Sequence, residues 1–196
     1  MLDAMGVMYR AEDDVAELLV PFVQGQRPSV SAEDVAARYT EASLGQLDAD
    51  AFWRSLGLHP SVEDDYLSLH RVTEGLLDFL GMVRNEGIEV WCLSNDVSRW
   101  SVKLRERFAI NDLFAGFVVS GDIGHRKPSA EAYGCLLDRV GVTPQLFVDD
   151  RPRNVAAAKR LGIPAVCFGA SGGGSDRVAS FADLAHSRRS LWCGQD

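Results

Sequence analysis

The chain has 196 residues, of which 46% are hydrophobic and 24% charged, and its formal net charge at pH 7 is -8. This length suits one compact domain, or one domain with a small insertion. The negative charge argues against nucleic acid or an anionic membrane as the main partner, and no apolar run approaches the roughly 20 residues of a membrane span. The four cysteines are widely spaced, without a C-x-x-C pair, so we expect reduced thiols and a cytoplasmic protein.

The chain opens with a very short apolar segment followed by a long helical one. Only Met1 and Leu2 precede Asp3, although a strand usually runs about five residues, so either this strand is very short or the natural chain begins upstream. Segments 11–23, 31–43 and 48–57 are typical of helices, and none alternates with a strand. Residues 11–70 carry twelve Asp and Glu against three Arg, and no Lys. We therefore expect a helical insertion over residues 9–71.

From Val72 onward, predicted helices alternate with short apolar runs. The runs are 88–93, 116–120, 145–148 and 164–168, and the helices are 73–87, 96–108, 129–141 and 152–162. Short, fully apolar strands that alternate with helices indicate a parallel sheet covered on both faces. The predicted fold class is therefore α/β, a Rossmann-like parallel sheet formed by residues 1–8 and 72–196, with the helical insertion after the first strand.

Polar side chains follow each apolar run. In an open parallel sheet, ligands bind beyond the carboxyl ends of the strands, so these residues are the candidates for a site. In chain order they are Asp3, Ser94, Asn95, Lys127, Asp149 and Asp150. Each one alone is more often a helix cap or a solvated loop residue. Capping does not readily produce this order of residue types at four successive strand ends.

This ordered set resembles the haloacid dehalogenase-like superfamily, which consists mostly of phosphatases and phosphotransferases, and the resemblance covers essentially the whole chain. The motifs are "DAMGV" at 3–7, "CLSND" at 92–96, "GHRKP" at 124–128 and "FVDDRPRNVAAAKRLG" at 147–162. The helical insertion at 9–71 corresponds to the small helical cap that one subfamily carries at this position. The implied roles are nucleophile for Asp3, phosphate binding for Ser94 and Asn95, catalysis and phosphate binding for Lys127, and magnesium binding for Asp150 with Asp149 in support.

Elementary chemistry supports the same roles. A carboxylate can attack phosphorus only when the charge of the phosphoryl oxygens is offset, because two anions repel each other. Mg²⁺ prefers a few hard oxygen ligands, which Asp3, the backbone carbonyl of Met5 and Asp150 can supply. Lys127 brings a point charge, and Ser94 can donate a hydrogen bond to a phosphoryl oxygen. We expect Mg²⁺ as cofactor, a small phosphorylated metabolite as substrate, and a monomer or homodimer.

Met5 is the main departure from the family pattern. In hydrolytic members this position is usually Asp, which protonates the leaving oxygen and later activates water. A thioether does neither, and general acid–base catalysis typically contributes about 10²–10⁴-fold. His125, beside Lys127, is one candidate for a substitute acid. We therefore predict an aspartyl-phosphate mechanism that favours substrates with acidic leaving groups.

Other readings of the site remain open. A protein that binds a phosphorylated ligand without turning it over would also tolerate Met5. A 2-haloacid dehalogenase has a non-acidic residue at this position, and the insertion has arginines at 27, 38 and 54 that could hold a carboxylate. The acidic pair of Asp149 and Asp150 argues against it, because these charges would repel Asp3 and a carboxylate substrate. Phosphonate cleavage is excluded, since the insertion has no lysine to form a Schiff base.

Overall fold

The protein is described here by a computed structural model over residues 1–169 and 176–192. Within these residues, five strands form the sheet: β1 (Trp91–Ser94), β2 (Gly116–Val119), β3 (Phe147–Asp149), β4 (Ala165–Phe168) and β5 (Arg177–Val178). Every pairing is parallel, with β1 beside β2, β3 beside β4, and β4 beside β5. Leu2 joins the two halves through parallel bridges to Cys92 and Val148. The predicted parallel α/β fold is confirmed, with a first strand reduced to one bridging residue.

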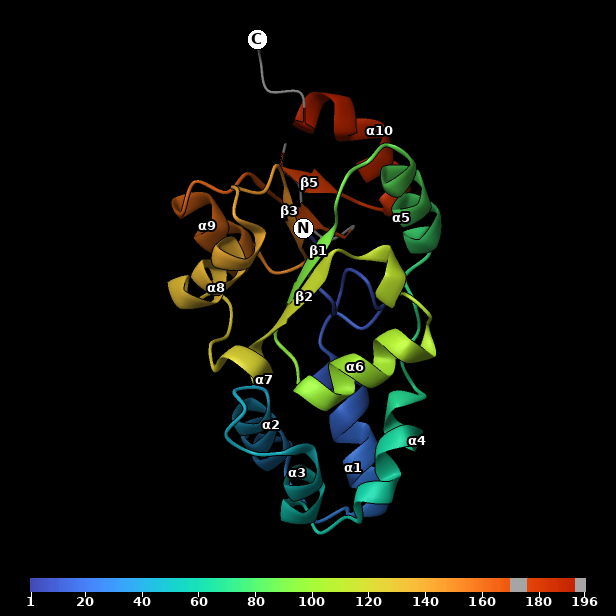
Figure 1. The fold of residues 1–196 in the computed structure, drawn as a ribbon. Coiled ribbons are helices and arrows are strands. Elements are labelled where there is room, and N and C mark those ends of the chain that lie inside the picture. The colour runs from blue at the N-terminus through green and yellow to red at the C-terminus, as the bar shows by residue number, and fades with distance from the viewer. Residues whose placement is uncertain (170–175, 193–196) are drawn as a thin grey trace.

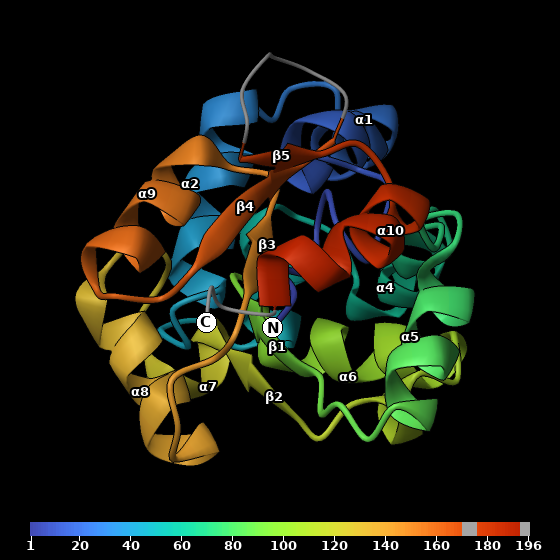
Figure 2. The same ribbon diagram turned by 90° about the horizontal axis from the view of Figure 1, so that it is seen from above.

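Helices cover both faces of the sheet. They are α5 (Leu76–Asn85), α6 (Ser98–Arg107), η3 (Asn111–Leu113), α7 (Ser120–Ile123), α8 (Ala130–Val140), α9 (Pro152–Arg160) and α10 (Phe181–Trp192). Figure 2 shows α8 and α9 on one side of the sheet and α5, α6 and α10 on the other. Adjacent strand residues therefore enter different hydrophobic clusters: Phe147 packs toward α8 and α9, whereas Val148 packs in the other cluster. Burial on both faces explains why the strands are apolar throughout.

Residues 15–67, all of which the structure describes, form helices and turns without a strand. They comprise η1 (Val15–Leu19), α1 (Val20–Gln26), α2 (Ala32–Ala42), α3 (Ala49–Ser55), η2 (Pro60–Val62) and α4 (Glu63–Leu67). The Ser31 side chain caps α2 by accepting a hydrogen bond from the Asp34 N–H. Figure 1 shows α1 to α4 together at one end of the molecule. A separate cap over residues 9–71 stays a prediction, because the hydrophobic cluster is continuous between this segment and the sheet.

The two chain crossings between the helical segment and the sheet lie side by side. Tyr9 and Val72 form an antiparallel bridge. The Arg10 N–H donates to the Arg71 carbonyl at 3.0 Å, and the Thr73 N–H donates to the Met8 carbonyl at 2.9 Å. These hydrogen bonds hold the entry and exit strands of the insertion as a short paired ribbon.

Glu63 fastens the helical segment to α6. Its side chain is 2% exposed, and Oε2 accepts hydrogen bonds from the indole N–H groups of Trp53 at 3.2 Å and Trp100 at 2.8 Å. Arg99 Nη2 lies 2.7 Å from the same oxygen, and Lys103 Nζ lies 2.9 Å from Oε1. The aromatic rings pack against each other, with the Trp53 and Trp100 centroids 5.4 Å apart. Glu63 thus completes a polar centre inside an aromatic cluster.

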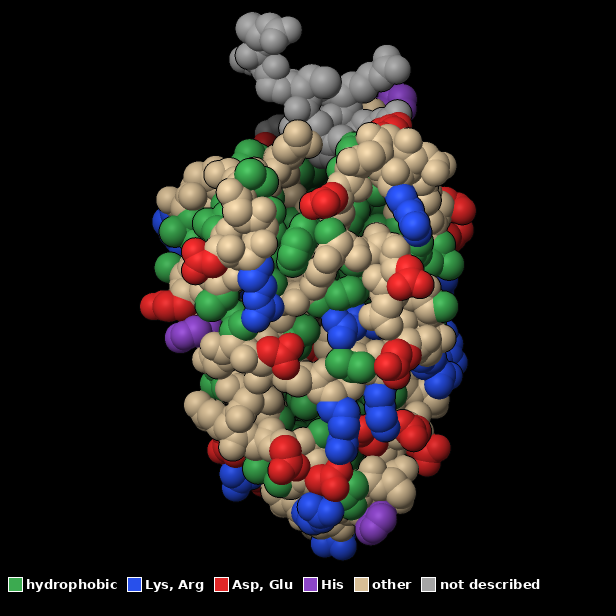
Figure 3. Space-filling view, in the orientation of Figure 1, with side chains coloured by type: hydrophobic (Ala, Val, Ile, Leu, Met, Phe, Trp, Pro, Cys, Tyr) green, Lys and Arg blue, Asp and Glu red, His purple; other side chains and the backbone are tan. Residues whose placement is uncertain are grey.

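The distribution of surface charge and the state of the cysteines can be described for the residues that the structure covers. On the face in Figure 3, acidic and basic side chains are interspersed rather than gathered into one basic patch. Among the described residues, no helix is both long and apolar enough to cross a membrane. Cys92, Cys135 and Cys167 are free thiols, and Cys193 lies outside the described residues.

Candidate active site

The predicted site residues meet at the carboxyl edge of the sheet. Asp3 follows the Leu2 bridge, Ser94 ends β1 and Asp149 ends β3. Oxygen atoms of Asp3, Asp149 and Asp150 all lie within 4.8 Å of one another. The parallel pairing brings these residues together, although more than 140 positions separate Asp3 from Asp149 in the sequence.

Lys127 lies between two of these carboxylates. Its Nζ is 2.5 Å from Asp3 Oδ1 and 2.8 Å from Asp149 Oδ2, and it donates to the Leu93 carbonyl at 2.6 Å. The side chain is 1% exposed, so Lys127 is not a solvated loop residue. Burial alone would lower the pKa of Lys127, but the charges of Asp149 and Asp3 outweigh it and raise the pKa above its ordinary value. The site therefore holds a permanent ammonium.

Hydrogen-bond donors at the start of α9 hold the Asp149 side chain in place. Oδ1 accepts hydrogen bonds from the Arg151 N–H at 2.9 Å and from Asn154 Nδ2 at 3.0 Å. Together with Lys127, these contacts occupy both carboxylate oxygens of a completely buried side chain. Asp149 is thus suited to orient the other groups, and Asn154 is a site residue that the sequence analysis missed.

Asp150 has a free acceptor. Its Oδ1 is buried and has no hydrogen-bond partner among the described residues. Burial, and then the charge of Asp149, raise the pKa of Asp150 to about 6. Gly6 permits the close approach of the first motif, because at φ +74° a Cβ on Gly6 would lie 2.5 Å from Asp150 Cγ.

The donor set fits a divalent cation. Burial, followed by the charge of Asp149, raises the pKa of Asp3 well above its usual range, and Lys127 only partly opposes this. Lys127 and Arg151, whose Nε lies 3.5 Å from Asp150 Oδ2, bring two positive charges to three clustered carboxylates, and Asp150 Oδ1 has no hydrogen-bond partner among the described residues, so one further positive charge is needed. A hard cation among these oxygens would supply it.

Ser94 and Asn95 lie in different surroundings. The Ser94 Oγ is buried and has no hydrogen-bond partner among the described residues. The Asn95 side chain bridges the backbone of Lys127: Oδ1 accepts from its N–H at 2.8 Å and Nδ2 donates to its carbonyl at 2.9 Å. Asn95 therefore positions the lysine loop, and direct phosphate binding by Ser94 or Asn95 stays a prediction.

Asp96 opens the helix predicted over residues 96–108, where an Asp is most simply an N-cap, and this prediction is wrong. Helix α6 begins at Ser98, and its N-cap position is Val97. Asp96 is 1% exposed, and its Oδ1 accepts a hydrogen bond from the Val97 N–H at 2.7 Å. Burial, and then the charge of Asp14, raise the pKa of Asp96 well above its usual range. The reason is tertiary: the helical insertion covers this turn and removes it from water.

A cavity of about 580 Å³ connects the acidic cluster with the helical segment. The core contributes Asp3, Met5, Asn95 and Asp150, and the helical segment contributes, among others, Asp14 and Tyr39. Three arginines also line it, at positions 126, 151 and 153. This volume suits a small metabolite.

Several candidates from the sequence lie away from this cavity. His125 is exposed and is not among the residues that line it. Neither are the arginines at 27, 38 and 54, and Arg38 and Arg54 pair with Glu41 and Asp50 on their own helices. Conversely, sequence reasoning missed Asp14, Tyr39 and the arginines that do line the cavity. Arg126 could have been suspected because it precedes Lys127, whereas nothing in the local pattern distinguishes Asp14.

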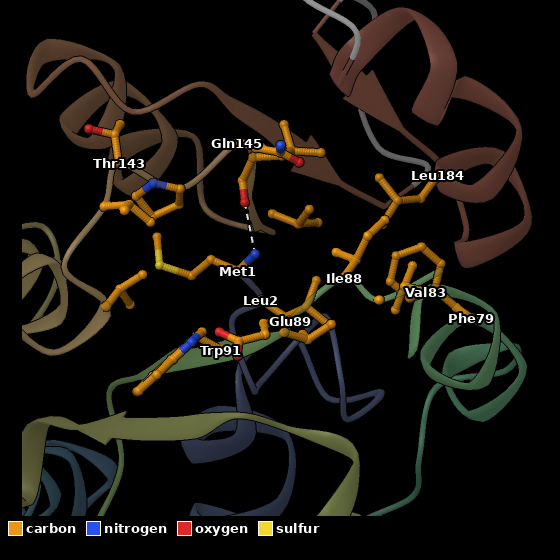
Figure 4. A pocket seen from close by; sticks show the side chains of 17 residues that line it. Met1, Leu2, Phe79, Val83, Ile88, Glu89, Trp91, Thr143, Gln145 and Leu184 are labelled. Carbon is orange, nitrogen blue, oxygen red and sulfur yellow. Dashed lines mark hydrogen bonds between the residues drawn. The ribbon is translucent and has the colours of Figure 1, made fainter. Parts of the chain in front are cut away.

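A second cavity lies at the opposite end of the sheet, at the amino ends of β1 and β3. It measures about 310 Å³, and mostly apolar side chains line it. Figure 4 shows Leu2, Val83, Ile88 and Leu184 around it, with the amino group of Met1 donating a hydrogen bond at 2.8 Å to the Leu146 carbonyl. None of the predicted site residues lines this cavity. The acidic cluster is therefore the better candidate for chemistry.

Comparisons with known proteins agree with this geometry. The family model for haloacid dehalogenase-like hydrolases matches residues 3–162. A phosphoglycolate phosphatase of Rhodospirillum rubrum is 30% identical over 181 residues, which cover 89% of this chain and 75% of the relative. The match to a phosphoglycolate phosphatase of Pseudomonas putida, at 31% identity, covers 53% of this chain and 40% of that protein, so the chain spans well under half of that relative's length.

Solved structures share the fold. A phosphatase of the family from Thermococcus onnurineus superposes with a TM-score of 0.70 at 19% identity, covering 99% of this chain and 97% of the other. A family enzyme from Bacteroides thetaiotaomicron, solved in complex with magnesium and inorganic phosphate, has a TM-score of 0.66 at 20% identity and covers 89% of this chain and 95% of the other. The family match, the fold and the converging motifs lead to one conclusion: the chain belongs to the haloacid dehalogenase-like hydrolase family.

Proposed function

We propose that the protein is a phosphatase that hydrolyses a small phosphorylated metabolite through an aspartyl-phosphate on Asp3. The observation that carries the proposal is the contact between Lys127 Nζ and Asp3 Oδ1 at 2.5 Å, beside a cavity that also borders Asp150. The buried ammonium opposes the burial and the Asp149 charge that raise the pKa of Asp3, and a bound cation would act in the same direction, so that Asp3 becomes ionised as a nucleophile requires. The same ammonium offsets the charge of an incoming phosphoryl group, whose oxygens would otherwise repel Asp3.

Magnesium is the proposed cofactor. Asp3, the backbone carbonyl of Met5 and Asp150 would hold it, with Asp149 in support. The clustered carboxylates and the unpartnered Asp150 Oδ1 support this assignment. When bound, the ion supplies positive charge against the phosphoryl oxygens.

The remaining residues orient the substrate and enclose it. Ser94 Oγ, buried and without a partner among the described residues, is available to donate to a phosphoryl oxygen. Asn95 keeps Lys127 in position through two backbone hydrogen bonds. Residues 9–71 act as a cap, since Asp14 and Tyr39 from this segment line the same cavity as Asp3. The cap thereby limits substrate size and excludes water from the reacting atoms.

The proposed substrate class is a small phosphorylated acid. Arg126, Arg151 and Arg153 line the cavity beside the acidic cluster, and guanidinium groups are suited to carboxylates and phosphates. The curated relatives from Pseudomonas putida and Rhodospirillum rubrum are named phosphoglycolate phosphatases. Phosphoglycolate is therefore the first substrate to test.

Phosphate release tests the proposal. We expect the protein with Mg²⁺ to release phosphate from phosphoglycolate or another member of a panel of small alkyl, aryl and acyl phosphates. Asp3→Asn should abolish release from every substrate, because an amide cannot act as the nucleophile. Asp78→Asn makes the same chemical change at an exposed position of α5 and should leave the rates unchanged.

Two results would contradict the phosphatase. Turnover that survives Asp3→Asn would end the aspartyl-phosphate mechanism. Binding of a phosphorylated ligand without release from any substrate would instead favour a catalytically inactive binding protein, to which Met5 also points.

A further inference from the structure

Asp14 is a buried carboxylate in the cavity with no assigned task. It directly precedes η1 and is 6% exposed. It lines the same cavity as Asp3 and Met5. Its Oδ2 atom is buried and has no hydrogen-bond partner among the residues the structure describes. A buried carboxylate oxygen without a donor is costly, so its position calls for an explanation.

Charged and titratable groups face Asp14 from several elements. Asp13 is its neighbour on the same element, and Arg126 and Arg151 approach from the loops that precede α8 and α9. Asp96 comes from the turn after β1, and Tyr39 and Tyr66 come from α2 and α4. Burial, and then the charge of Asp13, raise the pKa of Asp14 to about 7, and the arginines only partly oppose this. At neutral pH this carboxyl group therefore exists in both protonation states.

A purely structural role does not account for these features. A structural buried carboxylate gathers donors, as Glu63 does from two indoles and Arg99. Asp14 has an unpartnered oxygen and a pKa near neutrality. Those are the properties of a group that gives and takes a proton during turnover.

We propose that Asp14 is the general acid–base residue that replaces the acid missing at Met5. As the bond between an Asp3 oxygen and phosphorus forms, the bond from phosphorus to the leaving oxygen breaks, and the Asp14 proton passes to that oxygen to give the alcohol. In the second step water attacks the aspartyl-phosphate. The proton of this water passes to the Asp14 carboxylate, the bond from Asp3 to phosphorus breaks, and phosphate leaves. Both carboxyl groups return to their starting states.

This inference rests on the proposed phosphatase activity and changes its substrate preference. Met5 by itself predicts that alkyl esters react poorly. With Asp14 as donor, alkyl and aryl esters both phosphorylate Asp3, and only the alkyl esters depend on Asp14 in this first step. An aryl oxide such as p-nitrophenolate leaves without a proton, whereas an alkoxide does not.

The leaving-group dependence of Asp14→Asn tests the assignment. The measured quantity is kcat/KM, which reports the steps up to formation of the aspartyl-phosphate and excludes its hydrolysis, a step common to all substrates. With phosphoglycolate and glycerol phosphate as alkyl esters, kcat/KM should fall about 10²–10⁴-fold, while kcat/KM for p-nitrophenyl phosphate should change less than about threefold. The retained aryl activity also shows that the variant is folded. Glu17→Gln, an exposed carboxylate on η1, is the matched control and should leave both rates unchanged.

The pH profile adds a second readout. The kcat/KM for alkyl esters should fall as the pH rises through about 7, because the deprotonated Asp14 has no proton to give in the first step. Asp14→Asn should remove that limb of the profile, and p-nitrophenyl phosphate should not show it.

Met5→Asp provides a test that does not require an Asp14 variant to fold. If Asp14 already donates the proton, Met5→Asp should raise alkyl-ester turnover of the otherwise native protein less than about threefold, and it should rescue Asp14→Asn. A rise of about tenfold or more in the native background would show that no acid was present. Equal losses of kcat/KM for alkyl and aryl esters in Asp14→Asn, or no loss, would also overturn the proposal. If Asp3→Asn leaves turnover intact, the failure lies with the phosphatase mechanism.

Discussion

Glu63 and Asp14 are both carboxylates of the helical segment, and both are buried, yet they differ in their partners. Glu63 accepts hydrogen bonds from Trp53, Trp100 and Arg99. Burial alone would raise the pKa of Glu63, but the contacts with Arg99, Lys103 and Trp100 lower it below its usual value. Asp14 has an unpartnered oxygen and a pKa of about 7. Donors, rather than burial, decide whether a buried carboxylate stabilises the fold or keeps a proton for chemistry.

The acidic cluster at the sheet edge extends this comparison. Asp149 resembles Glu63, because donors occupy both of its oxygens. Asp150 resembles Asp14, because it keeps a free oxygen and a raised pKa of about 6. The difference between the two is that an oxygen of Asp150 lies within 4.8 Å of oxygens of both Asp3 and Asp149, where a cation can compensate the charge.

The largest expected difference between substitutions of these carboxylates is in Mg²⁺ affinity. Asp150→Asn removes a proposed ligand and should weaken Mg²⁺ binding about a hundredfold or more, measured by calorimetric titration. Glu63→Gln is the control, because Glu63 already has its donors and should contribute nothing to cation binding. Equal Mg²⁺ affinity in the native protein and Asp150→Asn would contradict the assignment of the site.

Replacing Glu63 should lower the stability of the fold, whereas replacing Asp14 should raise it. Glu63→Gln leaves Arg99 and Lys103 without their shared anion and should lower the free energy of unfolding by about 2 kcal/mol at pH 7. This is less than the loss for a fully buried pair, because both cations are more than one-third exposed. Chemical denaturation at a series of pH values measures it. Since the folded pKa of Glu63 is lowered, the difference should shrink as the pH falls below its unfolded value of 4.5.

Asp14→Asn should produce the smallest of these effects, an increase in the free energy of unfolding. The folded pKa of about 7 lies above the unfolded value of 3.8, so ionisation of Asp14 costs stability increasingly as the pH rises between these values. At pH 8 the variant should be more stable than the native protein by about 1 kcal/mol, and near pH 4 the difference should vanish. Denaturation without Mg²⁺ at both pH values tests this. A variant that is less stable at pH 8 would mean that the Asp14 carboxylate supports the fold, as Glu63 does.

The sequence predicted much of the sheet and the grouping of polar residues at its carboxyl edge. The apolar runs after Val72 predicted the parallel strands, because only strands buried on both faces lack polar alternation. Parallel strands share one carboxyl edge, so Asp3, Lys127, Asp149 and Asp150 could be placed together before their contacts were known. The structure places the Lys127 ammonium beside Asp3 and Asp149 and groups the oxygens of the three carboxylates.

Other features depended on how the helical segment packs on the sheet. Local pattern could not show that Asp96 is covered, that His125 is exposed, or that Asp14 lines the cavity. Asp14 lies in the segment "AEDD" at 11–14, which is typical of the solvated start of a helix. Tyr39, Asn95 and Arg126, which lie far away in sequence, line the same cavity as Asp14. Periodicity records which side of an element is apolar, whereas the partner of a polar side chain is set only when distant elements meet.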